Sequence, residues 1–184
     1  MVQDWIQWLV SFPISQAPIF DSTGDNVQKA NKDTNNIFFL TGAPYKNATR
    51  NVTIDSNRYA AIFFPVIDGI FTYQPTGIFA LTDLFGSPHD ILYERNNKFQ
   101  ITEAIATFDG QPLKMYKAKS TVFMMHYNPD NPYKIKEGNW NTLVTGDFIY
   151  LPITDVRGNH TLHLKGQDTD GYHQEVTYHL HIVS

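Results

Sequence analysis

The chain has 184 residues, of which 42% are hydrophobic, 14% aromatic and only 17% charged. This composition excludes a disordered chain and a coiled coil, because globular proteins normally carry about 25% charged residues. The net charge of −4, without clusters of Lys or Arg, argues against a nucleic-acid partner. No apolar run approaches the roughly 18 residues that span a bilayer. We therefore expect one globular domain over residues 1–184, with no integral membrane segment.

An amphipathic helix is predicted for residues 4–12. Asp4 can cap it, Pro13 ends it, and apolar side chains recur at helical spacing at Trp5, Trp8, Leu9 and Phe12. The two tryptophans are typical of a helix that covers the open end of a β core. The polar, turn-rich segment 15–36 is expected to be an ordered surface loop.

From residue 37 onwards the hydrophobic pattern changes to a period of two, which is typical of strands with one buried face. Strands are predicted at 37–41, 50–54, 60–66, 99–108, 114–117, 121–127, 148–153, 160–165 and 174–183. Residues near 82–97 are the exception, with helical spacing of Ile91, Leu92 and Arg95. Short strands without β-α-β alternation predict an all-β fold, an antiparallel sandwich or jelly roll with two short helices.

The last two predicted strands show the clearest alternation in the chain. Apolar residues at Val176, Tyr178, Leu180 and Ile182 alternate with polar ones, and Leu162 and Leu164 do the same in the preceding strand. The sequence Asp-Thr-Asp-Gly at residues 168–171 lies between them and predicts a hairpin turn rather than a calcium loop. Asp68-Gly69 and Asp109-Gly110 are likewise interpreted as turns.

The polar face of this hairpin carries three histidines, His163, His179 and His181. Residues i and i+2 share a face, and a paired strand can add a third side chain to it. Three imidazoles with an open fourth position would make a catalytic zinc site. A solvated strand face explains the same histidines without any metal, so a divalent cation is only an alternative, and no cofactor is predicted.

Segment 128–141 combines planar amides, a carboxylate and two aromatic rings in what we expect to be one loop. Aromatic faces stack on sugar rings, and Asn side chains supply directional hydrogen bonds. The candidate contacts for a glycan or protein ligand are Tyr133, Trp140, Asn131 and Asn139. The alternative is a proline-stiffened loop in which Trp140 is buried.

Motifs for common enzymes are missing from the sequence. It has no cysteine, no G-x-S-x-G elbow, no H-E-x-x-H pair and no phosphate-binding glycine loop. Only four glutamates are present, so a pair of catalytic carboxylates for glycoside hydrolysis is hard to nominate. Nothing in the residues calls for catalysis, although nothing excludes it.

Several ordered segments resemble a family of uncharacterised exported microbial proteins that carry a leader peptide. The resemblance covers nearly the whole chain and rests mainly on residues 21–24, 37–42, 62–66, 108–110, 146–152, 158–162 and 176–180. It implies a β-rich fold and a secreted or cell-surface location, with the leader absent from this sequence. It implies no activity, because the family has none established.

The same resemblance draws attention to Val27 and Val52, where family members tend to have cysteines. If those cysteines form a bridge, this chain has replaced both halves with apolar residues. We therefore expect the two valines to pack together.

Three functions remain open at this stage. The favoured one is a non-catalytic extracytoplasmic binding module for a glycan or a protein. The second is a small metal-dependent hydrolase or isomerase that uses the three histidines. The third is a structural domain of an envelope assembly, which predicts an exposed apolar patch or an unpaired edge strand rather than a pocket.

Overall fold

A computed structural model describes residues 1–74 and 86–184 of the chain. Its strands are β1 (Ile37–Phe39), β2 (Asn47–Asp55), β3 (Ala61–Thr72), β4 (Ile101–Phe108), β5 (Gln111–Pro112), β6 (Tyr116–Lys119), β7 (Phe123–Tyr127), β8 (Gly138–Pro152), β9 (Gly158–Asp168) and β10 (His173–Val183). Its helices are α1 (Val2–Val10), α2 (Asp25–Ala30) and α3 (Pro88–Lys98), with short 3-10 turns at Ile14–Gln16 and Pro18–Phe20. Within these described residues, no helix is long and apolar enough to cross a membrane.

The strands form two five-stranded sheets. One has the order β1-β3-β8-β6, with β7 also paired to β8, and the other has the order β2-β10-β9-β4-β5. The prediction of a β-rich fold with few helices is confirmed, and the strands form two sheets; a jelly roll is not confirmed. The expectation of purely antiparallel pairing is wrong, because β1 pairs with β3 in parallel and β2 pairs with β10 in parallel. β1 and β2 are consecutive in the sequence but lie in different sheets, each beside a parallel strand.

The C-terminal hairpin is confirmed residue by residue. β9 and β10 pair antiparallel over most of their length, with Leu164 opposite Val176 and Leu162 opposite Tyr178. These four side chains are fully buried. The alternation in the sequence therefore gave the correct strands and the correct buried face.

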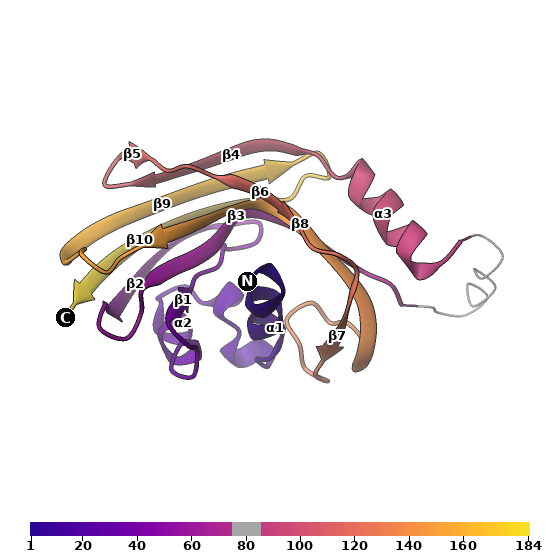
Figure 1. Ribbon diagram of the computed structural model, residues 1–184, viewed down its shortest axis with the longest axis horizontal. Coiled ribbons are helices and arrows are strands. Elements are labelled where there is room, and N and C mark those ends of the chain that lie inside the picture. Colours follow the sequence, from indigo (N-terminus) through magenta and orange to yellow (C-terminus); the bar gives the residue numbers. More distant parts are fainter. Residues whose placement is uncertain (75–85) are drawn as a thin grey trace.

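Hydrophobic side chains form two clusters, one on each face of the β3-β8 sheet. The first fills the space between the two sheets and includes Phe64, Ile149 and Leu180. The second lies between the other face and the N-terminal segment, where Trp5 and Leu9 of α1 pack near Phe148. The molecule is therefore layered as sheet, sheet and helical segment, with α1 on the concave side of the sheets (Figure 1).

Helix α1 is fixed to this face by its tryptophans. Trp5 Nε1 donates to the Leu40 carbonyl oxygen at 2.9 Å, and Trp8 Nε1 donates to the Ala30 carbonyl oxygen at 3.0 Å. As predicted, the tryptophans of α1 cover the β core. The helix lies against the face of a sheet, however, and not across the open end of the core.

The segment predicted as a loop at 15–36 also contains helix α2. Its N-terminus is held by Asp21, whose Oδ2 accepts the backbone N–H groups of Asn26 and Val27 at 2.8 and 3.1 Å. These bonds hold the pKa of Asp21 below its usual range even though burial acts in the opposite direction. Val27 and Val52 are both buried in the inter-sheet cluster. Their replacement of a bridge stays a prediction.

Helix α3 corresponds to the predicted helical excursion near 82–97. It begins with a capping box in which Ser87 and Asp90 exchange hydrogen bonds. Residues 82–85 of that prediction lie outside the described residues.

A bulge at Val66 changes the register of β3 against β8. Pro65 lies opposite Phe148, and the next paired residue is Ile67, opposite Asp147. Because a bulge reverses which residues face each side of a sheet, Asp68 takes a different facing from the one that strict alternation would give it. β1 pairs with the second edge of β3 only from Ala61 to Phe63. No described strand pairs with that edge beyond Phe63.

Candidate functional site

The unpaired edge of β3 borders a cleft of about 590 Å³. Five consecutive residues of β3, from Asp68 to Thr72, line it. The remaining walls come from the segment before β2, the loop before β8 and the β9–β10 turn. Aromatic side chains are the commonest lining group, contributed by Phe20, Tyr45, Phe71, Phe99, Tyr127, Tyr133 and Tyr172. A concave, largely aromatic cavity of this size is typical of small-ligand sites.

Asp68 is the unexpected residue in this cleft. The prediction that Asp68-Gly69 forms a turn is wrong, because both residues lie within β3 and pair with β8. Burial raises the pKa of the Asp68 carboxyl group to about 7, and no hydrogen bond or ion pair to another described residue offsets that cost. Asp-Gly is a strong turn signal, but here apolar residues continue on both sides of it, and that continuity was the signal of a strand.

Two tyrosines lie near this carboxyl group. Burial raises the pKa of Tyr133 and of Tyr172, and the negative charge of Asp68 is the second cause in both cases. Both phenols therefore stay protonated at neutral pH and can donate hydrogen bonds. Because Tyr172 donates its hydroxyl proton to Gln174, the cleft combines one carboxyl group, unpaired among the described residues, with the hydroxyl donor of Tyr133.

Hydrogen bonds within the protein hold the cleft wall that the β9–β10 turn forms. Asp168 Oδ1 accepts the backbone N–H groups of Asp170 and Tyr172 at 2.8 and 3.0 Å, which makes Asp168 a turn-forming residue, as predicted. The Tyr172 hydroxyl donates to Gln174 Oε1 at 2.7 Å, and Gln174 Nε2 donates to the Val66 carbonyl oxygen at 2.6 Å. These bonds tie the turn to the bulge of β3.

Gln174 reaches the bulge because Gly42 leaves the space that it needs. A Cβ atom at residue 42 would overlap the Gln174 side-chain amide. The cleft wall around Thr41 and Gly42 therefore depends on a glycine that permits close approach, not on its flexibility.

The opposite wall is held by a buried arginine. Arg50 is 0% exposed, and it donates to the carbonyl oxygens of Asp21, Thr41 and Ile19 at 2.8, 2.9 and 3.2 Å. Its Nη1 also donates to the Tyr178 hydroxyl at 2.6 Å. Arg50 therefore satisfies the backbone of the segments that carry Ile19 and Thr41, both of which line the cleft. The sequence did not single it out, because a charged residue in an alternating strand normally faces solvent.

The four predicted ligand contacts do not share one surface. Tyr133 lines the cleft and is half-buried. Trp140 lies in β8 instead of a loop, is half-buried against the second cluster, and donates from Nε1 to the Lys136 carbonyl oxygen at 2.7 Å. Asn139 is exposed and contacts His126 Nδ1 through its Oδ1 at 2.9 Å.

Asn131, the fourth of these residues, is fully buried. Its Nδ2 donates to the carbonyl oxygens of Asn128 and Ile135, and its Oδ1 accepts the N–H groups of Tyr133 and Ile135. All the hydrogen-bonding groups of its amide are used within the loop, so Asn131 positions Tyr133 at the edge of the cleft.

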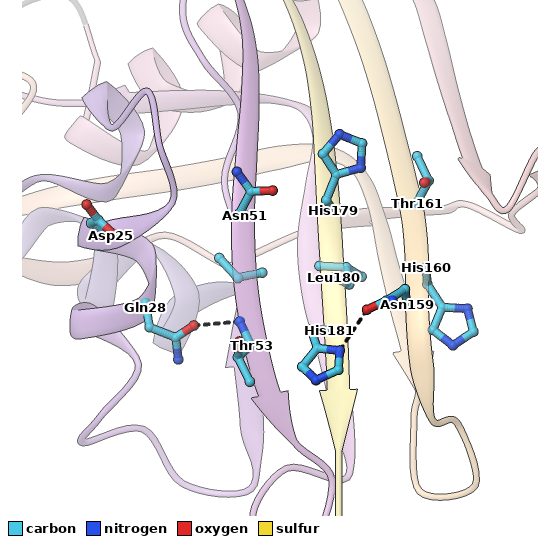
Figure 2. Close-up of a pocket in the computed structure, with 11 residues that line it drawn as sticks. Asp25, Gln28, Asn51, Thr53, Asn159, His160, Thr161, His179, Leu180 and His181 are labelled. Carbon is cyan, nitrogen blue, oxygen red and sulfur yellow. Dashed lines mark hydrogen bonds between the residues drawn. The ribbon is translucent and has the colours of Figure 1, made fainter.

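A second concave surface lies on the outer face of the other sheet, next to α2. This groove of about 520 Å³ is lined by the polar residues Asp25, Gln28, Asn51, Asn159, His179 and His181, among others. Figure 2 shows Asn51, His179, His181 and Asn159 along neighbouring strands and Asp25 and Gln28 on α2. His181 Nδ1 is bonded to Asn159 Oδ1 at 2.7 Å. Gln28 of α2 accepts the Thr53 N–H at 2.8 Å, so the groove is closed on one side by the helix.

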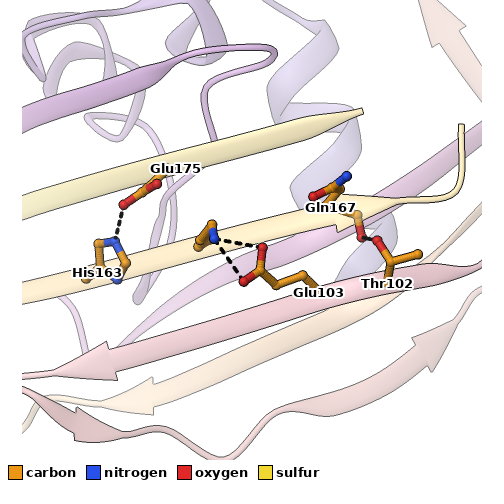
Figure 3. Close-up of polar contacts among 6 residues, drawn as sticks. Thr102, Glu103, His163, Gln167 and Glu175 are labelled. Carbon is orange, nitrogen blue, oxygen red and sulfur yellow. Dashed lines mark hydrogen bonds and ion pairs between the residues drawn. The ribbon is translucent and has the colours of Figure 1, made fainter. Parts of the chain in front are cut away.

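The histidines considered as metal ligands share this outer face but have separate partners. His163 lies opposite Thr177, and its Nε2 is 3.0 Å from Glu175 Oε1 (Figure 3). His181 is bonded to Asn159, and His179 lies opposite Thr161. Over residues 1–74 and 86–184, no three His, Asp or Glu side chains are grouped so that they could hold a metal ion.

His160, a further histidine at the border of the groove, is paired with a carboxylate. Its Nδ1 is 2.7 Å from Asp109 Oδ2, and its ring stacks on Phe108 with the ring centres 4.9 Å apart. The hydrogen bond to Asp109 raises the pKa of His160, and the same contact lowers the pKa of Asp109. In Figure 2 the His160 ring points away from His179 and His181, so it does not extend their cluster.

The comparisons with known proteins found no counterpart. No family model, curated protein or solved structure matches this chain. The exported family named from the sequence therefore stays a prediction, and the function has to be argued from the cleft and the groove.

Proposed function

We propose that the protein is a non-catalytic binding module whose ligand occupies the cleft beside β3. The observation that carries this proposal is the gathering of aromatic rings around one carboxyl group that has no partner of its own. These rings come from segments far apart in the sequence, so the fold itself builds the site. A pocket lined by rings with few polar groups is what binding of a compact organic ligand requires.

Binding fits the residues of the cleft better than catalysis does. Of its three carboxylates, Asp168 is occupied by the turn, and the tyrosines beside Asp68 remain protonated. The described lining contains no histidine, serine or lysine that could act with Asp68 as an acid–base or nucleophilic pair. The cleft offers ring faces, the hydroxyl donor of Tyr133 and the carboxyl group of Asp68, which together can recognise a ligand.

The glycan or protein ligand expected from the sequence remains within this proposal, with Tyr133 as the retained contact. A secreted or cell-surface location is part of the proposal too, and it is supported by the family resemblance alone. The metal-dependent alternative has no converged ligand set in the described residues. The assembly alternative is supported by unpaired strand edges in the described sheets, and one of them, the edge of β3, lies in the cleft.

The test compares two exposed tyrosines. Tyr45 lines the cleft with a left-handed backbone (φ of 56°), which asparagine also adopts, while Tyr116 lies on β6 outside the cleft. Binding of methyl glucoside, N-acetylglucosamine, choline and 3,3-dimethylbutan-1-ol would be measured by saturation-transfer NMR. We expect at least one of these probes to bind, with about tenfold weaker affinity in Tyr45→Asn and unchanged affinity in Tyr116→Asn. Absence of binding by all four, or equal effects of both variants, would overturn the proposal.

A further inference from the structure

The charged side chains that line the cleft are all acidic, while Lys46 and Arg95 at its border donate to the carbonyl oxygens of Phe20 and Thr72. Asp68, Asp168 and Asp170 line it, and its described lining contains no Lys, Arg or His. The cation behind the wall, Arg50, is fully buried and directs its donors at backbone carbonyl oxygens and the Tyr178 hydroxyl. The cleft therefore repels anions and attracts cations.

Among the three carboxylates, Asp68 is the one that burial desolvates and that has no hydrogen bond or ion pair to another described residue. Asp168 serves the turn, and Asp170 is exposed to solvent. Tyr133 from the loop before β8 and Tyr172 from the β9–β10 turn interact electrostatically with Asp68. Asp168 at the end of β9 and Tyr127 of β7 are further titratable groups of the cleft lining. Protonated phenols do not neutralise a carboxylate, so its charge is left for the ligand to balance.

The aromatic rings of the cleft also favour a cationic ligand. The face of a tyrosine or phenylalanine ring is the negative end of its quadrupole, and it attracts ammonium groups placed against it. Recognition of quaternary ammonium groups by protein cavities uses rings of this kind together with a nearby carboxylate. Tyr133 and Tyr172 supply such rings beside Asp68, and Phe71 lies two residues further along β3.

We propose that the ligand of this cleft carries an organic cation, a protonated amine or a quaternary ammonium group, held beside Asp68 and against the tyrosine rings. This inference rests on the proposed function, because it names the class of ligand for the same site. A neutral sugar could use the rings but would leave the charge of Asp68 without a partner. The matched neutral form of any ligand should therefore bind more weakly.

The decisive experiment compares choline with 3,3-dimethylbutan-1-ol, its neutral isostere in which carbon replaces the ammonium nitrogen. Titrations at pH 8 should give at least about tenfold tighter binding of choline. Asp68→Asn should remove this difference. Asp25→Asn changes the net charge equally but lies in the outer groove, so it should leave the difference intact.

The pH dependence supplies a second readout. Because burial raises the pKa of Asp68 to about 7 and choline keeps its charge at every pH, only the ionised form of Asp68 should favour binding. Choline affinity should rise about tenfold from pH 6 to pH 8, and the rise should be absent in Asp68→Asn.

The two proposals fail in different ways. If the neutral isostere binds as tightly as choline and Tyr45→Asn weakens both, the cleft is a binding site but the cation is wrong. If neither compound binds, the proposed function is contradicted as well. Choline binding that survives Asp68→Asn at full strength would also overturn the inference.

Discussion

The cleft and the outer groove have similar volumes, about 590 and 520 Å³, but they treat polar side chains in opposite ways. In the groove, Asn159 on an exposed strand face is bonded to His181, and at its border Asp109, in the turn after β4, is bonded to His160. In the cleft, Asp68 has no such partner among the described residues. Accordingly, the pKa of Asp109 is lowered while the pKa of Asp68 is raised.

Residue type alone therefore does not make a site. The groove carries the histidines that attract attention in the sequence, and there His181 is bonded to Asn159 while Gln28 accepts the Thr53 N–H. The cleft carries a single carboxyl group whose desolvation leaves it dependent on a ligand. Depth and the lack of internal partners distinguish the two surfaces.

The largest expected effect is the loss of stability in Arg50→Met, a substitution behind the wall of the cleft. Without the guanidinium group, the buried carbonyl oxygens of Ile19, Asp21 and Thr41 lose their donor. We expect the free energy of unfolding to fall by about 3–5 kcal/mol, measured by urea denaturation. The control is Arg157→Met, because Arg157 donates to carbonyl oxygens at an exposed turn, and its loss should change stability by less than about 0.5 kcal/mol.

An intermediate effect is expected for Asp68→Asn. The folded-state pKa of Asp68 lies above its unfolded value of 3.8, so its protonated form stabilises the fold at low pH and this contribution is lost as the pH rises to about 7. At pH 8 the variant should therefore be more stable than the wild type by about 1–3 kcal/mol. Thermal unfolding from pH 4 to pH 8 tests this; parallel stability curves for the two proteins would contradict it.

The smallest effect is expected beside the groove, for Asp109→Asn. The hydrogen bond between His160 and the Asp109 carboxylate raises the pKa of His160. The stabilisation of the fold by this bond is therefore complete below pH 6.5 and disappears as the pH rises through the higher folded-state pKa of His160. NMR titration should show a lower pKa for His160 in the variant, with a loss of stability at pH 5 of less than about 1 kcal/mol. An unchanged His160 titration would show that the bond to Asp109 is not formed in solution.

The sequence predicted the strands well because alternation reports directly on burial. Every predicted strand segment between residues 37 and 183 has a counterpart, and Tyr178 and Leu180 are buried as expected. The parallel pairs were not predictable, since nothing local records that Asn47 lies opposite Glu175. Pairing over such a distance is a property of the whole fold.

The site was predicted only through Tyr133. Asp68 was missed because its Asp-Gly sequence carries a stronger local signal for a turn than for a strand, and the bulge that re-aims it cannot be seen in the sequence. Trp140 was assigned to a loop because Gly138 and Asn139 precede it, but β8 begins at Gly138. In each case tertiary pairing overrode the local preference.

The place of β10 in its sheet has a consequence for how the protein is made. β10 lies between β2 and β9, so the last strand in sequence is an inner strand of the sheet. Until it emerges, β2 and β9 each have an edge with unpaired backbone groups, and such edges are prone to join other chains. Completion of this sheet therefore follows synthesis of β10, after the other described strands of both sheets have been made.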